Sequence, residues 1–180
     1  GEKDEISVDI CQKIRYNNYM TKLYYTWADI ESMMAEITRQ LSQQNIKPDV
    51  VFGPGRGGYP IGVMLSHYLD VPFHGFEWQT RDGDVEDSEQ LKALLSKYFS
   101  SYNIVIIDDI NDTGRTLNGI HDVVCSEGLN ECVTYVSLLE KMSSDFSTQI
   151  CAKELDEEEG KQWIVFPYEE WWNNKTGEQR

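Results

Sequence analysis

Carboxylates and hydroxyls gather at the end of one apolar run, in the stretch IVIIDDINDTGRTL (104–117). The apolar run predicts a buried strand over 104–108, and the acidic and small residues after it predict a turn into a helix. Neighbouring carboxylates suit sugar hydroxyls or a hydrated Mg²⁺ ion, and hydroxyls beside a helix N-terminus suit phosphate. Capping the helix would require one acid rather than three. The stretch therefore predicts a site for a phosphorylated sugar, made by Asp108, Asp109, Asp112, Thr113, Gly114, Arg115 and Thr116.

A second segment that could bind a ligand is the glycine-rich GPGRGGYP (53–60), which follows the short apolar run DVVFG (49–53). Its basic residue, Arg56, can bind phosphate oxygens with the fork of its guanidinium group. Glycines let the backbone approach a ligand closely, and three of them flank the arginine: Gly55, Gly57 and Gly58. Taken alone, such a segment is equally consistent with an ordinary turn. Its place upstream of the acidic stretch favours a second part of the same site.

Strands and helices must alternate to position these two segments. Apolar runs predict strands at 20–26, 49–53, 71–78, 104–108, 132–140 and 161–172. Helical spacing of apolar residues predicts helices at 27–43, 60–69, 91–99 and 114–127. Thr26 and Asp29 form a variant of the capping box at the start of the first helix. The polar segments 79–90 and 143–160 are predicted as an exposed loop and an insertion.

This alternation predicts one α/β domain over residues 1–180, with a Rossmann-like parallel sheet flanked by helices. Strands that are continuous apolar runs are typical of a parallel sheet covered on both faces. In such sheets, ligands bind at the carboxyl ends of the strands. Both motifs fall at predicted strand ends, so we expect Arg56 and the acidic stretch to meet at one edge of the sheet.

The 104–117 stretch closely resembles the motif that binds 5-phosphoribosyl 1-pyrophosphate (PRPP) in type I phosphoribosyltransferases: an apolar strand, two acids, three residues and T-G-x-T. The resemblance implies that Asp108 and Asp109 hold the ribose hydroxyls, directly or through Mg²⁺. It also implies that residues 113–116 hold the 5′-phosphate. The glycine-rich segment resembles the pyrophosphate loop of the family, with Arg56 as its basic residue and a cis peptide bond between Gly55 and Arg56.

A third resemblance concerns the acceptor base. WIVFPYE (163–169), together with Lys141, resembles the purine-binding hood of bacterial xanthine-guanine phosphoribosyltransferases and their hypoxanthine-guanine relatives. It implies that Trp163 stacks on the base, that backbone groups near Ile164 read an exocyclic position, and that Lys141 donates to a 6-oxo oxygen. As alternatives, Trp163 is a core aromatic residue and Lys141 a solvated lysine. Met142 departs from the family pattern, because a proline frequently follows the lysine there.

The family resemblance gives a core at about 20–140, a hood at about 141–172 and a reaction. The expected activity is transfer of the phosphoribosyl group from PRPP to guanine, xanthine or hypoxanthine. Asp112 would accept the proton of purine N7, while Arg56 and Mg²⁺ would stabilise the leaving pyrophosphate. A PRPP-sensing regulatory protein, or an enzyme for another base such as orotate, remains an alternative. The family also implies a homo-oligomer, either a dimer or a tetramer.

Segment 79–90 lies where the family has a mobile loop over the site. Its acids make it unusual as a lid over pyrophosphate, so an ordinary surface loop is an equal alternative. They are Asp82, Asp84, Glu86, Asp87 and Glu89.

Composition excludes several other classes of function. The net charge is −15, from 31 acidic and 16 basic residues, which argues against nucleic acid as a partner. No apolar run approaches the roughly 20 residues of a membrane span, and the polar N-terminus is not a secretory signal. We therefore expect a cytoplasmic protein with no membrane partner. The scattered cysteines lack the spacing of a zinc site and are expected to be reduced thiols: Cys11, Cys125, Cys132 and Cys151.

Overall fold

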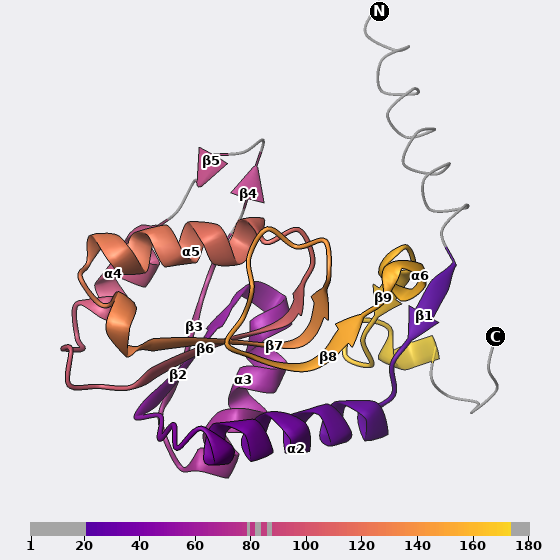
Figure 1. The fold of residues 1–180 in the computed structure, drawn as a ribbon, viewed down its shortest axis with the longest axis horizontal. Helices are drawn as coiled ribbons and strands as arrows, with labels where there is room; N and C mark the ends of the chain where they lie inside the picture. The colour runs from indigo at the N-terminus through magenta and orange to yellow at the C-terminus, as the bar shows by residue number, and fades with distance from the viewer. Residues whose placement is uncertain (1–20, 79, 82–83, 86–87, 174–180) are drawn as a thin grey trace, which may run out of the picture.

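A five-stranded parallel sheet forms the centre of the protein (Figure 1). The computed structural model describes residues 21–78, 80–81, 84–85 and 88–173. Every pair of neighbouring strands in this sheet is parallel. Their order across the sheet is β3 (Phe73–Phe76), β2 (Val50–Pro54), β6 (Ile104–Asn111), β7 (Val133–Lys141) and β8 (Ile150–Leu155).

Two pairs of helices cover the two faces of this sheet (Figure 1). One face packs against α2 (Trp27–Gln43) and α3 (Gly55–Leu69), and the other against α4 (Glu89–Leu95) and α5 (Arg115–Ser126). Successive strand residues alternate between the two cores, since side chains along a strand point to opposite faces. Burial on both faces explains why β2 and β6 are continuous apolar runs. The predicted α/β, Rossmann-like architecture is confirmed.

Helix α2 forms where its capping signal and its apolar spacing place it. The Thr26 hydroxyl accepts a hydrogen bond from the Asp29 backbone N–H at 3.1 Å, and the Asp29 carboxylate accepts one from the Thr26 N–H at 2.7 Å. This reciprocal pair satisfies two N–H groups that have no partner within the helix. The buried face of the helix consists of Ile30, Met33, Met34, Ile37 and Leu41. Both the capping box and this face were predicted from the sequence.

A second, two-stranded parallel sheet lies beside the main one and joins the two ends of the described chain (Figure 1). It consists of β1 (Lys22–Tyr24) and β9 (Trp163–Val165), with Leu23 opposite Ile164. The remaining elements are short: the antiparallel pair β4 (Thr80–Arg81) and β5 (Asp84–Val85), helix α6 (Glu157–Gly160), and 3-10 turns at Asn130–Cys132 and Trp171–Asn173.

The sequence had predicted that segment 143–160 is an insertion, and this prediction is wrong. The segment contains β8, an edge strand of the main sheet, followed by α6. The main sheet therefore extends to Leu155, beyond the predicted end of the core at about residue 140. The predicted strand 161–172 is also too long, because only Trp163–Val165 is a strand and a turn follows at once.

Two corrections concern the motifs themselves. The predicted helix 60–69 begins five residues earlier, so Gly55, Arg56, Gly57 and Gly58 form its first turn rather than a preceding loop. Strand β6 continues past residue 108 to Asn111, which places Asp108 and Asp109 within the strand. The segment 79–90, for which an ordinary loop and a lid were equal alternatives, lies partly outside the described residues; its described part contains β4, β5 and the start of α4.

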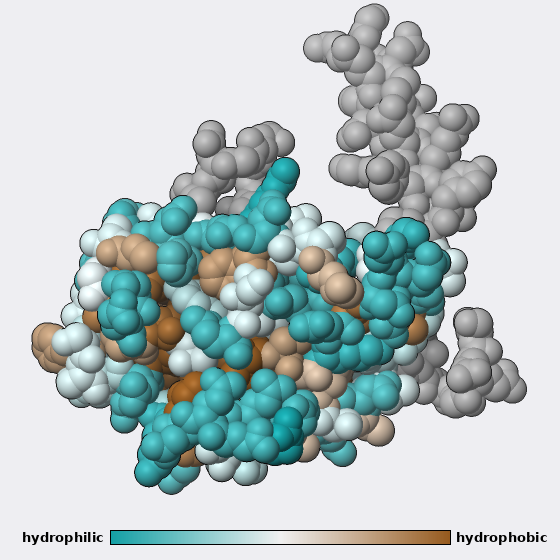
Figure 2. Space-filling model, viewed as in Figure 1, coloured by the Kyte–Doolittle hydropathy of each residue, from teal (hydrophilic) through white to brown (hydrophobic). Residues whose placement is uncertain are grey.

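The face in Figure 2 is mostly hydrophilic, with apolar residues in scattered patches. Among the described residues, no helix is both long enough and apolar enough to cross a membrane.

Gly58 lets the first turn of α3 lie directly on the sheet. A Cβ atom there would lie 2.6 Å from Pro54 Cδ and 2.8 Å from the carbonyl oxygen of Ile107. We predict that Gly58→Ala lowers the free energy of unfolding by about 1–3 kcal/mol, because these neighbours are too rigid to give way. Urea denaturation measures the change. Val63→Ala, at an exposed position of the same helix, should change stability far less, and equal losses in both variants would contradict the packing argument.

Candidate active site

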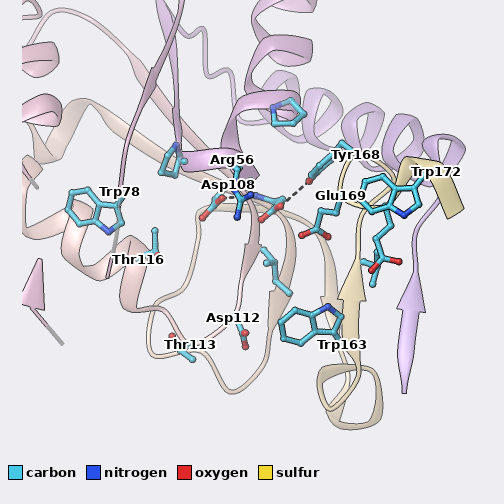
Figure 3. Close-up of a pocket in the computed structure, with 18 residues that line it drawn as sticks. Arg56, Trp78, Asp108, Asp112, Thr113, Thr116, Trp163, Tyr168, Glu169 and Trp172 are labelled. Carbon is cyan, nitrogen blue, oxygen red and sulfur yellow. Dashed lines mark hydrogen bonds between the residues drawn. The ribbon is translucent and has the colours of Figure 1, made fainter. Parts of the chain in front are cut away.

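A cleft with a volume of about 920 Å³ opens at the carboxyl ends of β2 and β6 (Figure 3). It collects side chains from four parts of the chain: the first turn of α3, the segment just after β3, the end of β6 with the turn after it, and the C-terminal segment. Its lining includes Gly55, Arg56, Gly57, Trp78, Asp108, Asp109, Asp112, Thr113, Thr116, Trp163, Tyr168, Glu169 and Trp172. The two sequence motifs therefore meet in one place, as the parallel sheet predicted.

The first turn of α3 contributes a cation and close backbone contact. Gly55 begins the helix with φ at +52°, a conformation that side chains disfavour. Arg56 is exposed and lines the cleft. Gly57 lies so near the sheet that a Cβ atom on it would be 2.6 Å from Asp109 Oδ1. The Gly55–Arg56 peptide bond is trans, so the cis bond implied by the family resemblance is absent here.

Asp108 and Asp109 are crowded carboxylates at the end of β6. Asp109 is only 9% exposed, and Asp108 is partly exposed. Burial raises the pKa of Asp108 well above its usual range, and the charge of Asp109 raises it further. Burial also raises the pKa of Asp109, although a hydrogen bond from Tyr168 opposes the rise. A site that strains two carboxylates in this way favours a cation or hydroxyl donors as its ligand.

The donor set fits a Mg²⁺ ion that is shared with a substrate. Mg²⁺ usually keeps several waters and takes one or two carboxylates together with substrate phosphates. Asp108 and Asp109 supply such a pair, and within the described ranges no cluster of three His, Cys, Asp or Glu side chains offers a closed metal cage.

The turn after β6 leads directly into the N-terminus of α5. Gly114 is the N-cap, with φ at +87°, and the helix begins at Arg115. Thr113 and Thr116 line the cleft, whereas Gly114 is buried and Arg115 is exposed outside the lining. Backbone N–H groups at the start of α5, with the two hydroxyls, form an arrangement that suits an anion.

A hydrogen-bond network around the buried side chain of Asn111 fixes this turn, and it was not predicted from the sequence. The Asn111 side-chain amide donates to the Phe146 carbonyl at 2.6 Å and to the Glu140 carboxylate at 3.0 Å. Its amide oxygen accepts a hydrogen bond from the Ser144 hydroxyl at 2.9 Å. The Asp145 N–H donates to the Thr113 carbonyl at 3.0 Å. The connection after β7 therefore holds the turn after β6 in place.

Trp163 lines the other side of the cleft, and Lys141 lies behind the lining residue Asp112. Trp163 is 54% exposed and lines the cleft, which excludes the alternative of a core aromatic residue. Lys141 Nζ lies 2.6 Å from Asp112 Oδ1, so this lysine is not a solvated side chain. Lys141 and Asp112 meet because the residues that precede them, Glu140 and Asn111, lie opposite each other in the sheet. The Ile164 side chain packs against the core, leaving only its backbone for recognition.

The C-terminal segment contributes residues that the sequence did not single out. Tyr168 Oη donates a hydrogen bond to Asp109 Oδ2 at 3.0 Å, and Glu169 and Trp172 also line the cleft (Figure 3). A turn closed by two hydrogen bonds between Phe166 and Glu169 presents them. No spacing rule could have found Tyr168, since its partner is far away in the chain.

We predict that Asn111→Ala lowers the free energy of unfolding by about 1–3 kcal/mol, because partly buried partners of the amide lose their hydrogen bonds. Urea denaturation measures the loss. Asn130→Ala is the matched control, since that exposed amide bonds only its exposed neighbour Glu131. A stability change no larger than the control's would show that the network does not hold the turn.

Comparison with known proteins agrees with the geometry of this cleft. Residues 20–173 match the phosphoribosyl transferase domain family. A curated adenine phosphoribosyltransferase from Methanococcus maripaludis is 30% identical over 98 residues, which are 49% of this chain and 56% of the relative. The chain thus spans about half the length of the curated relatives it matches.

Solved structures extend the likeness over more of the chain. A purine phosphoribosyltransferase from Pyrococcus horikoshii has a TM-score of 0.65 at 26% identity and covers 83% of this chain and 95% of its own. The xanthine-guanine-hypoxanthine phosphoribosyltransferase of Helicobacter pylori has a TM-score of 0.70 at 19% identity, with 87% and 99% covered, which shows the shared fold. Because the family match takes in almost all of the described chain, the protein belongs to the type I phosphoribosyltransferases.

Proposed function

We propose that this protein transfers the 5-phosphoribosyl group of PRPP to a 6-oxopurine, giving the nucleoside monophosphate and pyrophosphate. One observation carries the proposal: a single cleft gathers an arginine in a glycine-rich turn, two strand-end acids, a hydroxyl-rich helix start and an exposed tryptophan. These groups match the parts of PRPP and a flat base in number and in chemistry.

The two ends of the cleft suit the two phosphate-bearing ends of PRPP. The turn at Thr113 and Thr116 offers hydroxyls and helix N–H groups for the 5′-phosphate. Arg56, with the backbone of residues 55–58, offers donors for the pyrophosphate. Asp108 and Asp109 lie between these two groups in the sequence, and both line the cleft. They would accept hydrogen bonds from the ribose hydroxyls.

Positive charge is needed where the pyrophosphate leaves. Five acids line the cleft, Asp108, Asp109, Asp112, Glu169 and Glu170, against the one arginine. Mg²⁺ held by Asp108 and Asp109 would neutralise the leaving pyrophosphate when bound. Arg56 donates hydrogen bonds to the same oxygens, and its charge is worth most as the bond to ribose breaks.

The base side of the cleft suits a purine with an oxygen at position 6. Trp163 offers an exposed aromatic face for stacking. The Lys141 ammonium group has three N–H donors, so it can keep its contact with Asp112 and still donate to a 6-oxo group. Asp112 would accept the proton of N7 as N9 bonds to the ribose.

Adenine is the second candidate acceptor, because the curated relatives that match this chain are adenine phosphoribosyltransferases. Their alignment covers about half of the chain. The reaction and the PRPP site would be the same for both candidates. The acceptor assay below separates them.

We predict that Arg56→Ala weakens the binding of PRPP and of pyrophosphate by about tenfold or more, the scale of a lost hydrogen bond to a charged group. The nucleotide product should bind nearly as before, since it carries no pyrophosphate. Calorimetric titration of the three ligands measures the difference. Arg39→Ala, on the exposed surface of α2 where it pairs with Glu36, is the control. Equal losses for all three ligands would mean that Arg56 is only structural.

We predict that adenine is a poor acceptor, with a kcat/KM about a thousandfold or more below that of the best 6-oxopurine. Its 6-amino group would face the Lys141 ammonium group, so two hydrogen-bond donors would oppose each other with no acceptor between them. Incubation with PRPP, Mg²⁺ and each of guanine, xanthine, hypoxanthine, adenine and orotate measures the ratio. Efficient turnover of adenine would favour the second candidate and overturn the assignment of Lys141.

We further predict that Lys141→Ala reduces the discrimination against adenine by about tenfold or more, because the opposing donor is removed. Lys161→Ala is the matched control, since this exposed lysine pairs with Glu158 outside the cleft. The ratio of kcat/KM values for the best 6-oxopurine and adenine is the readout. A ratio that stays at the wild-type value in Lys141→Ala would refute the donor role.

A further inference from the structure

We propose that Tyr168 is a positioning residue, which orients the Asp109 carboxylate toward the ribose of PRPP and joins the base-binding segment to the sugar site. The inference rests on the proposed function. Its central observation is the hydrogen bond from Tyr168 Oη to Asp109 Oδ2, 3.0 Å long, which spans the cleft wall (Figure 3).

The Tyr168 ring is held firmly, so its hydroxyl occupies a fixed place. The ring stacks on Phe166 with centroids 5.4 Å apart and planes at 6°. Phe166 is itself in the core, with 2% of its surface exposed. Trp27, at the start of α2, packs on Tyr168 with the ring centroids 6.1 Å apart. The turn is closed by hydrogen bonds from the Glu169 N–H to the Phe166 carbonyl at 3.0 Å and from the Phe166 N–H to the Glu169 carboxylate at 2.8 Å.

Asp109 needs such a partner because it lies at a crowded and nearly buried position. Its Oδ1 oxygen faces Gly57, where a Cβ atom would approach to 2.6 Å. Its Oδ2 oxygen accepts the hydrogen bond of Tyr168. The two contacts together fix the plane of the carboxylate. A buried carboxylate without the hydroxyl would lose a charge-assisted hydrogen bond and the constraint on its rotation.

This arrangement leaves acceptor capacity for a substrate. A carboxylate has about four lone-pair sites, and Tyr168 uses one of them. Asp109 lines the cleft, so the remaining sites are available to ribose hydroxyls. The tyrosine therefore orients the acid without competing for the whole of it.

The same bond connects the two halves of the proposed site. Tyr168 follows β9, and β9 carries Trp163 on the base side of the cleft. Asp109 belongs to β6 in the main sheet, beside the first turn of α3. A shift of the C-terminal segment would therefore move the partner of the sugar-binding acid, so the base and sugar sites are built as one unit.

Tyr168→Phe tests this role, because it keeps the ring and removes only the hydroxyl. Calorimetric titration with PRPP and, separately, with inorganic pyrophosphate, both in the presence of Mg²⁺, measures the effect. We expect the affinity for PRPP to fall about tenfold, the scale of a hydrogen bond to a charged group. The affinity for pyrophosphate, which has no ribose and would meet Asp109 only through Mg²⁺, should fall clearly less than the affinity for PRPP.

Tyr25→Phe is the matched control. Tyr25 also packs its ring on Phe166, with centroids 6.0 Å apart, but it does not line the cleft. Both ligands should bind this variant as they bind the wild type. The comparison separates loss of the Asp109 contact from loss of a hydroxyl in the same aromatic cluster.

A double-mutant cycle adds a readout that a structural role would not produce. If Tyr168 acts through Asp109, then Tyr168→Phe should cost much less PRPP affinity in an Asp109→Asn background than in the wild type. Losses that simply multiply would overturn the proposal. So would equal losses of PRPP and pyrophosphate in Tyr168→Phe, or an unchanged affinity for PRPP. A wild-type protein that binds no PRPP would overturn the proposed function as well, and is recognised before any variant is made.

Discussion

The contact between the first turn of α3 and the end of β6 is the constraint on which the cleft depends. Gly57 and Gly58 bring the helix so close to the strand that a methyl group at either position would collide with Asp109 or with the Ile107 carbonyl. The glycine-rich turn and the acids are therefore neighbours because of backbone packing, not because of an attraction between Arg56 and the carboxylates. The helix start and strand end face the cleft together, where a ligand can touch both.

Much of this arrangement was predictable because it follows from local patterns. Continuous apolar runs indicated a parallel sheet, and the order of motifs along the chain placed Arg56 and the acids at one edge. Strand β8 was missed because its sequence, ICAKEL, mixes small, apolar and charged residues. An edge strand is only partly buried, so it does not need the apolar run that marks a central strand.

Side-chain partners across the chain were not predictable. Lys141 was expected near a base, but its contact with Asp112 appears only when β6 and β7 are paired in register. Tyr168 and Asn111 were not singled out by any sequence pattern, and their importance comes from the partners that the fold places beside them. The likeness to known proteins has the same limit. It establishes the family and leaves the acceptor base to be determined by experiment.

The pairing of β1 with β9 has a consequence for how the protein folds. Lys22 lies opposite Trp163, so the two strands meet only after nearly the whole chain has been placed. Closing so large a loop costs more conformational entropy than forming local contacts does. Contacts between residues so far apart in the chain therefore form slowly. The part proposed to bind PRPP, by contrast, is built from neighbouring strands of the main sheet. We therefore expect the main sheet to form first in a newly made chain, and the proposed base-binding segment to be completed last, when β1 pairs with β9.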